Sequence, residues 1–249
     1  MSLYTRIPIP ASRLEREDGK KAIVFLPAAG AVIGILIYVI SMVFGNNVIP
    51  VLFKLSVYIL IPLLVTGGFH VDGFMDVVDA RSSYKSREEK LTILKDPHIG
   101  SFAVIRLAMV GLCWLGGMGV IAGYANKDYL KLYAISFFTV RAACGIMSLC
   151  LRRAKKDGML YSETEGADNV DKVILIFELI AGALLMIMIK PVAALAAVAM
   201  LALFSACYRK LCYNEFGGVT GDTAGYYITV GETVTLMALA LAEIIEAAQ

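Results

Sequence analysis

Residues 23–44 read IVFLPAAGAVIGILIYVISMVF, an apolar stretch without a charged side chain. A helix needs about 20 such residues to cross the hydrocarbon core of a bilayer, so this stretch predicts a membrane span. Similar stretches follow at residues 50–67, 102–123, 130–151, 173–189, 192–208 and 227–245. The sequence therefore predicts an all-α integral membrane protein. A single polytopic domain over residues 1–249 would hold a bundle of about seven transmembrane helices.

The composition agrees with this fold class. Hydrophobic residues make up 59% of the chain and charged residues 18%, whereas soluble domains have about 45–50% and about 25%. The net charge of +2 and the scattered basic residues argue against a nucleic-acid partner. The expected partner of so apolar a chain is the lipid bilayer.

Lysine and arginine are concentrated in alternate connections between the spans. Residues 1–22, 68–101, 152–172 and the segment after residue 208 are basic, and the connections between them carry few positive charges. By the positive-inside rule, this asymmetry predicts a cytoplasmic N-terminus and places the basic segments in the cytoplasm.

Three aspartates follow the second span, in the segment GGFHVDGFMDVVDA at residues 67–80. On a helix Asp72, Asp76 and Asp79 stand at i, i+4 and i+7, so their carboxylates share one face. Like charges this close repel each other unless a cation lies between them, and Mg²⁺ prefers carboxylate oxygens and substrate phosphate. The interleaved apolar residues indicate an amphipathic helix at the cytoplasmic face. His70 is either a general base or a hydrogen-bonded interfacial histidine.

Two further polar segments lie on the same predicted face. Lys95 and Asp96 precede Pro97 at a sharp re-entry into the membrane, where Lys95 could meet a phosphate. The glycine-rich segment FGGVTGDTAG at residues 216–225 allows close backbone approach to a ligand. Its consecutive amides are expected to form an anion-binding nest, with Asp222 free to bind metal, unless the segment is only a hinge.

Ionisable residues within the predicted spans include Arg106, Arg141, Glu178 and Glu232. Charges near the bilayer centre cost about 3 kcal/mol or more, so such residues usually face the bundle interior and function there. For Arg141, a structural ion pair with an acidic neighbour and binding of substrate phosphate are equally supported. Glu232 is the better functional candidate.

These motifs, in this order, resemble the adenosylcobinamide-GDP ribazoletransferase family, also called cobalamin synthase. The resemblance covers nearly the whole chain and rests on five stretches: residues 5–10, residues 25–27, Gly67–Gly73 with Asp76 and Asp79, Lys95-Asp96 to Gly100, and Gly217–Thr223 to Glu232. It implies an enzyme of the bacterial cytoplasmic membrane with its active face in the cytoplasm. It is also compatible with a homo-oligomer.

The resemblance also implies the reaction and the site. Adenosylcobinamide-GDP would be joined to α-ribazole or its 5′-phosphate, with release of GMP and a requirement for Mg²⁺. Asp72, Asp76, Asp79 and Asp222 would hold the metal, and His70 or a free carboxylate would accept the hydroxyl proton. The substrate-binding set would be Lys95, Asp96, Arg141, Gly218, Thr220, Gly221 and Glu232.

Two alternatives remain at this point. A CDP-alcohol phosphotransferase also uses several aspartates at helical spacing, but its alanine-arginine pair is missing from the expected place: Ala80-Arg81 lies beyond the third aspartate. A cation transporter would place its carboxylates near the membrane midplane, often on repeated broken helices. Here the acids gather at one predicted face, and the sequence has no internal repeat.

Overall fold

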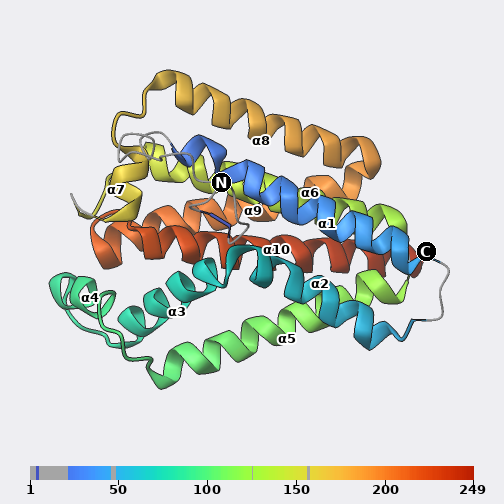
Figure 1. Ribbon diagram of the computed structural model, residues 1–249, viewed down its shortest axis with the longest axis horizontal. Coiled ribbons are helices and arrows are strands. Elements are labelled where there is room, and N and C mark those ends of the chain that lie inside the picture. The colour runs from blue at the N-terminus through green and yellow to red at the C-terminus, as the bar shows by residue number, and fades with distance from the viewer. Residues whose placement is uncertain (1–3, 6–21, 46–48, 125, 156–157) are drawn as a thin grey trace, which may run out of the picture.

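The computed structural model describes residues 4–5, 22–45, 49–124, 126–155 and 158–249, and these form a bundle of helices (Figure 1). Residues 6–10, part of the family resemblance, lie outside the described residues. The helices are η1 (Ala22–Phe25, a 3₁₀ turn), α1 (Leu26–Phe44), α2 (Val51–Thr66), α3 (Phe69–Ser82), α4 (Arg87–Ile93), α5 (Ser101–Gly123), α6 (Lys127–Cys150), α7 (Met159–Thr164), α8 (Asn169–Ile189), α9 (Pro191–Leu211), η2 (Cys212–Phe216, a π-helical turn) and α10 (Gly221–Ala247).

Six of these helical segments are long and apolar enough to cross a membrane: η1–α1, α5, α6, α8, α9–η2 and α10. The helices α2 and α3 pass the same test only together, and they are bent by 88° where they meet. Counting that pair as one span gives up to seven spans, which confirms the predicted all-α polytopic membrane fold. The 88° bend turns α3, which carries the aspartates, away from the direction of α2, so we place α3 at the membrane face.

The spans sort into an inner and an outer set. Helices α6 and α10 are the most buried spans, and α10 runs along the middle of the bundle (Figure 1). Helices α1, α5 and α8 instead expose large apolar side chains, among them Ile35, Leu112 and Phe177. Exposed side chains of this kind suit a lipid environment, where helices satisfy their backbone polar groups internally.

The contact between α1 and α6 depends on two glycines spaced four residues apart. A Cβ atom built on Gly30 would lie 2.3 Å from the Phe137 carbonyl oxygen, and one on Gly34 would lie 2.3 Å from that of Ala134. Both neighbours are backbone atoms of α6, which cannot move aside as a side chain can. This is the small-xxx-small pattern that lets membrane helices approach closely.

The bend between α2 and α3 has a local cause. Gly67 (φ 66°) and Gly68 (φ 80°) both adopt the left-handed conformation that glycine reaches without strain. The Thr66 hydroxyl donates to the Pro62 carbonyl at 2.8 Å and accepts from the Gly68 amide at 3.3 Å. The helix therefore ends at Thr66, and the chain restarts in a new direction.

After the bend, α3 packs against α10 with almost nothing between the two backbones. A Cβ atom on Gly73 would lie 2.9 Å from the carbonyl oxygen of Asp222, and one on Gly225 would lie 2.9 Å from that of His70. Nearby, the rings of Phe74 and Tyr226 stack with centroids 5.7 Å apart. This crossing brings the aspartate-bearing helix against the start of α10.

The α1–α6 contact makes a testable prediction. Gly34→Ala places a methyl group in contact with the α6 backbone, and overpacking of this kind lowers stability by about 1–3 kcal/mol or more. Gly119→Ala in α5 is the matched control, because its Cβ atom meets nothing within 4 Å. Thermal unfolding in detergent should show a lower midpoint for Gly34→Ala and an unchanged or higher one for the control. Equal midpoints would contradict the packing described.

Candidate active site

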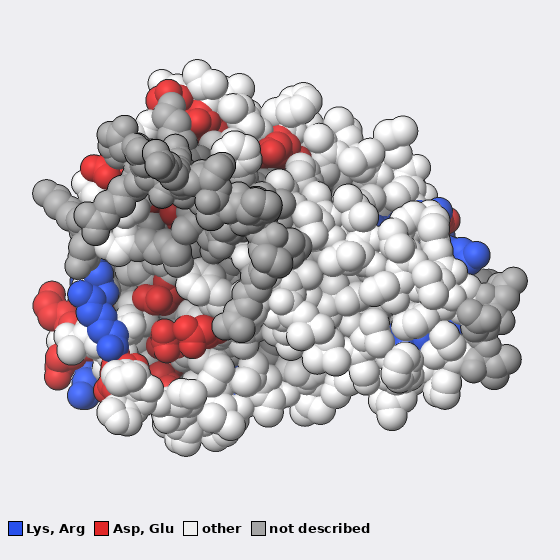
Figure 2. All heavy atoms as spheres, in the orientation of Figure 1, with Lys and Arg blue, Asp and Glu red and all other residues white. Residues whose placement is uncertain are grey.

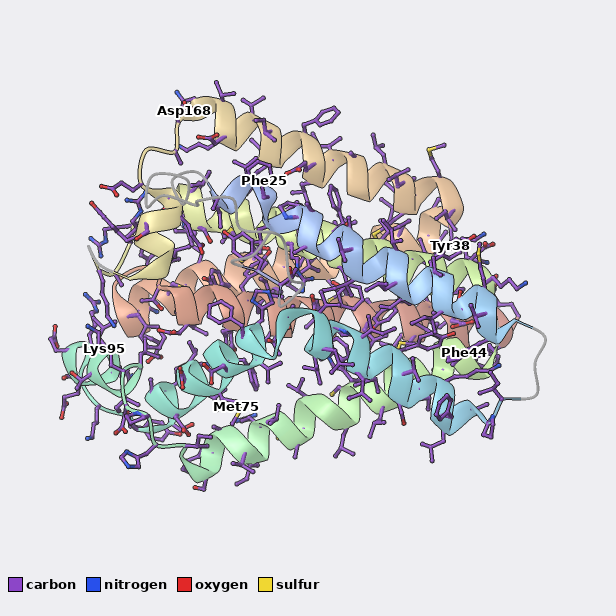
Figure 3. All side chains as sticks on the ribbon, viewed as in Figure 1. Phe25, Tyr38, Phe44, Met75, Lys95 and Asp168 are labelled. Carbon is purple, nitrogen blue, oxygen red and sulfur yellow. The ribbon has the colours of Figure 1, made fainter. Side chains whose placement is uncertain are left out.

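The polar residues gather at one end of the bundle, formed by α3, α4, α7 and the turn before α10, which we call the polar end. Figure 2 shows acidic and basic side chains clustered on this part of the surface, while most of the remaining visible surface is uncharged. Figure 3 places Lys95 and Met75, a residue of α3, toward this end, with Phe44 near the opposite one. The predicted active-face segments therefore lie together in space.

Asp79 has a structural partner that the sequence did not indicate. One carboxylate oxygen accepts the amide of Gly100 at 2.5 Å, and the other accepts the amide of Ala103 at 3.0 Å. The first amides of a helix lack partners within the helix, and an anion there is favoured by the helix dipole. Asp79 thus ties α3 to the start of α5, which leaves it the least available of the three aspartates for a metal ion.

Asp76 is the centre of the carboxylate cluster. Its pKa is raised from 3.8 to about 7, first because the side chain is half-buried and then because Asp72, Asp222 and Asp79 repel its charge. Two helices, α3 and α10, therefore concentrate four carboxylates in one place. Metal binding by Asp72, Asp76, Asp79 and Asp222 stays a prediction.

The described residues do not form a complete metal cage, since they contain no group of three or more His, Cys, Asp or Glu side chains arranged to hold an ion. This finding is compatible with Mg²⁺, which is usually bound by one or two carboxylates together with water and substrate phosphates. Asp72 is exposed and Asp222 is half-buried, so both remain accessible to such an ion. The donor set fits a magnesium–phosphate complex better than a metal held by protein alone.

A cavity of ≈ 280 Å³ adjoins this cluster. Four predicted site residues line it: Lys95, Thr220, Gly221 and Asp222. Thr220 caps α10 and forms a reciprocal capping box with Thr223, so the first residues of α10 are presented to the cavity in a fixed orientation. Positive side chains and a helix N-terminus around one cavity suit a bound phosphate.

Sequence reasoning missed two basic residues of the same cavity, Arg153 and Lys155. Arg153 lies over the Tyr161 ring at 5.2 Å and donates to the Thr164 carbonyl at 2.7 Å. Lys155 donates to the Leu91 carbonyl at 3.1 Å and attracts the Asp222 carboxylate. The available signal is the basic run at residues 152–156, which also indicates membrane orientation.

The anion nest predicted for the glycine-rich segment is wrong. The amides of Gly218, Val219 and Thr220 donate to the Cys212 carbonyl, the Arg152 carbonyl and the Thr223 hydroxyl, at 3.0, 2.9 and 2.8 Å. Their hydrogen bonds are used within the fold, and they also fix the segment, so it is not a free hinge. Gly218 is needed because a Cβ atom there would lie 2.3 Å from the Arg152 carbonyl oxygen.

Arg141 and Glu232 form a salt bridge in the bundle interior, where their side chains are 1% and 7% exposed. Arg141 also donates to the Phe137 carbonyl at 3.2 Å. Of the two interpretations of Arg141, the structure therefore favours the ion pair. Both residues, together with His70, line a second cavity of ≈ 210 Å³, separate from the one beside Asp222.

Asp96 lies apart from the predicted site. Its carboxylate accepts the amide of His98 at 3.0 Å and pairs with the His98 ring at 2.7 Å, so it stabilises an exposed turn. Among the described residues that line the cavity beside Asp222, Lys95 is present and Asp96 is not.

Together, the fold and the site define a multi-pass membrane protein with a cluster of carboxylates and a basic cavity at one end of its bundle. A family model described as cobalamin-5-phosphate synthase matches residues 1–240, and the chain belongs to that family. No solved structure matches the chain.

Similar proteins bear the name adenosylcobinamide-GDP ribazoletransferase. The protein of Lachnoclostridium phytofermentans is 32% identical over 97% of this chain and 92% of its own length. Those of Clostridium botulinum strain Alaska E43 and Alkaliphilus oremlandii are each 31% identical, over 97% and 95% of this chain and 95% and 93% of their own lengths. Neither alternative, the CDP-alcohol phosphotransferase or the cation transporter, is supported by these matches.

The buried pair makes one prediction. Glu232→Gln leaves the Arg141 charge buried without a counter-charge, so the free energy of unfolding should fall by about 3–5 kcal/mol. The double variant Arg141→Met with Glu232→Leu should recover most of that loss. The control is Asp128→Asn, which breaks an exposed pair with Lys131 and should cost less than about 1 kcal/mol. Thermal unfolding in detergent measures all three, and an unchanged midpoint for Glu232→Gln would contradict a structural role.

The carboxylate cluster makes a second testable prediction. Because the pKa of Asp76 is about 7 in the folded protein and 3.8 ordinarily, the folded state binds more protons between these values. Stability without divalent cations should therefore fall as the pH rises from about 4 to about 7. Asp76→Asn should reduce this slope, whereas Asp128→Asn, at the opposite end of the bundle, should keep it. Identical melting profiles for wild type and Asp76→Asn would refute the clustering.

Proposed function

We propose that this protein is an adenosylcobinamide-GDP ribazoletransferase. The observation that carries the proposal is the convergence of Asp72, Asp76 and Asp222 beside a cavity lined by Lys95 and Lys155. A negatively charged cluster next to positive side chains suits a metal-bound diphosphate. The name of the relatives, adenosylcobinamide-GDP ribazoletransferase, indicates that this diphosphate is the one in adenosylcobinamide-GDP. The proposed substrates are adenosylcobinamide-GDP and α-ribazole or its 5′-phosphate.

Mg²⁺ is the proposed cofactor, with Asp72 and Asp222 as its protein ligands. When bound, it would neutralise charge on the diphosphate and on the departing GMP. Lys95, Lys155 and Arg153 would bind the non-bridging oxygens, and Gly221 would let the diphosphate approach the first turn of α10. Asp79 would act indirectly, by fixing α3 on α5.

The proposed reaction is a displacement at phosphorus. A ribose hydroxyl of α-ribazole attacks the phosphorus attached to cobinamide, a new phosphodiester bond forms, and the bond from that phosphorus to the bridging oxygen breaks. GMP leaves with the bond's electron pair, and the hydroxyl proton passes to a carboxylate. We assign that role to Asp76, since it lies in the same carboxylate cluster as the proposed metal ligands Asp72 and Asp222 and is not itself needed as a ligand. Such transfers depend mainly on positioning and charge neutralisation.

The proposed active face is cytoplasmic. Lys95, Arg153 and Lys155 lie at the polar end, and the positive-inside rule places basic connections in the cytoplasm. A nucleotide-linked donor would reach the site from that side.

Activity of the purified protein tests the proposal. Wild-type protein with adenosylcobinamide-GDP, Mg²⁺ and either acceptor should release GMP, and chelation of the metal should stop the reaction. Asp76→Asn should lower kcat by about 10²–10⁴-fold, the range for loss of a general base. Asp128→Asn should retain normal turnover. Folded wild-type protein that releases no GMP with either acceptor would overturn the proposal.

A further inference from the structure

The cavity of ≈ 210 Å³ lies in the bundle at the junction of α2 and α3. Its walls come from α2, α3, α5, α6 and α10, and they are mostly apolar. Leu63, Leu107 and Val110 form part of this apolar wall, and Trp114 lines the cavity from α5. Because drug-sized ligands need about 300–1,000 Å³, a cavity of this size suits a small ring system rather than a nucleotide or a corrin.

Two nitrogens of the lining residues have no hydrogen-bond partner among the described residues: Nε2 of His70 and Nε of Arg141. Both residues are buried: His70 is 6% exposed and Arg141 is 1% exposed. Buried polar groups are nearly always hydrogen-bonded, so an unpaired pair beside a cavity points to a ligand that can complete them. The Arg141 Nε–H is always a donor, so that ligand needs an acceptor atom.

Several other polar groups of the cavity are bonded within the protein. The Trp114 indole N–H donates to the Thr233 hydroxyl at 2.8 Å, and the Thr229 hydroxyl donates to the His70 carbonyl at 3.1 Å. The charge of Arg141 is balanced by Glu232. A matching ligand is therefore uncharged, largely apolar, and carries few acceptor atoms.

The cavity also borders the proposed reaction centre. His70 precedes Asp72 by two residues on α3, and it lines a small cavity of ≈ 30 Å³ together with Gly221 and Gly225 at the start of α10. His70 therefore lines the larger cavity and also lies where α3 crosses α10. This position favours a substrate with an apolar ring at one end and a reacting hydroxyl at the other.

We propose that this cavity binds the base of the acceptor, 5,6-dimethylbenzimidazole, an uncharged bicyclic aromatic ring with one free acceptor nitrogen. The assignment rests on the proposed function, because the acceptor α-ribazole is the riboside of this base. Arg141 Nε donates to the free ring nitrogen, and the ribose extends toward Asp76. The reaction thus takes place between an apolar subsite and the basic cavity at the polar end.

Gly111 gives a direct way to fill the cavity. It lines the cavity from α5, and a Cβ atom there would meet nothing within 4 Å, so Gly111→Leu is expected to fold. Gly119→Leu is the matched control on the same helix: its Cβ atom also meets nothing within 4 Å, and the residue is not part of this cavity's lining. Leu107→Phe, at another lining residue, is a second cavity-filling variant.

Trp114 is the chain's single tryptophan, so its fluorescence reports on this cavity without a label. Titration with free 5,6-dimethylbenzimidazole should change the emission saturably in the wild type and Gly119→Leu. The apparent Kd should rise at least tenfold in Gly111→Leu and in Leu107→Phe. Equal Kd values in all four proteins would overturn the assignment. So would quenching by brominated lipid chains that the base does not reverse, because a lipid would then occupy the cavity.

Kinetics separate this inference from the proposed function. Gly111→Leu should raise KM for α-ribazole at least tenfold and leave KM for adenosylcobinamide-GDP unchanged. An unchanged KM for α-ribazole, with normal GMP release, would overturn the cavity assignment alone. If wild-type protein binds the base with the expected Trp114 response but releases no GMP, the proposed function fails and the cavity's preference for the base stands.

Discussion

The close crossing of α3 and α10 is the constraint on which the rest of the site depends. Gly73 and Gly225 let the two backbones meet without side chains between them, and a methyl group on either would lie within 3 Å of a carbonyl oxygen. The glycines at 67 and 68 turn the chain so that α3 can reach this position. Loss of the close glycine contact or of the bend would separate Asp76 from Asp222, even if both helices still formed.

The crossing brings carboxylates together that repel one another, and other contacts must offset this repulsion. Asp79 relieves part of the charge by accepting two amides at the start of α5, so one of the aspartates strengthens the framework that carries the others. Lys155 offsets part of the charge of Asp222, while it is itself held by the Leu91 carbonyl. Repulsion remains at Asp76, as its raised pKa indicates. A cation and a polyanionic substrate, binding together, would remove it.

Much of this could be predicted from the sequence, because periodicity and charge are local signals. Apolar stretches predicted the spans, and helical spacing predicted that the aspartates share a face. The sequence could not show which groups a residue meets from another helix. In the sequence Asp79 is equivalent to Asp76, but in the fold its carboxylate accepts an amide at the start of α5. Likewise, Gly218 belongs to a segment typical of an anion nest, but the Val219 amide donates to the Arg152 carbonyl. The binding-site position of Arg153 and Lys155 could not be predicted, because membrane topology alone accounts for a basic run there.

The salt bridge between Arg141 and Glu232 shows why an apolar subsite can exist so close to a charged one. An unpaired charge in the bundle interior would draw in water or a counter-ion, and the cavity at the junction of α2 and α3 would then be polar. With the two charges paired, Arg141 Nε and His70 Nε2 still have no partner among the described residues, and a weakly polar ring can supply one. His70 then marks the boundary between the two environments, since its ring lines the apolar cavity while the next turns of its helix carry the carboxylates. A substrate that is apolar at one end and reactive at the other matches that boundary.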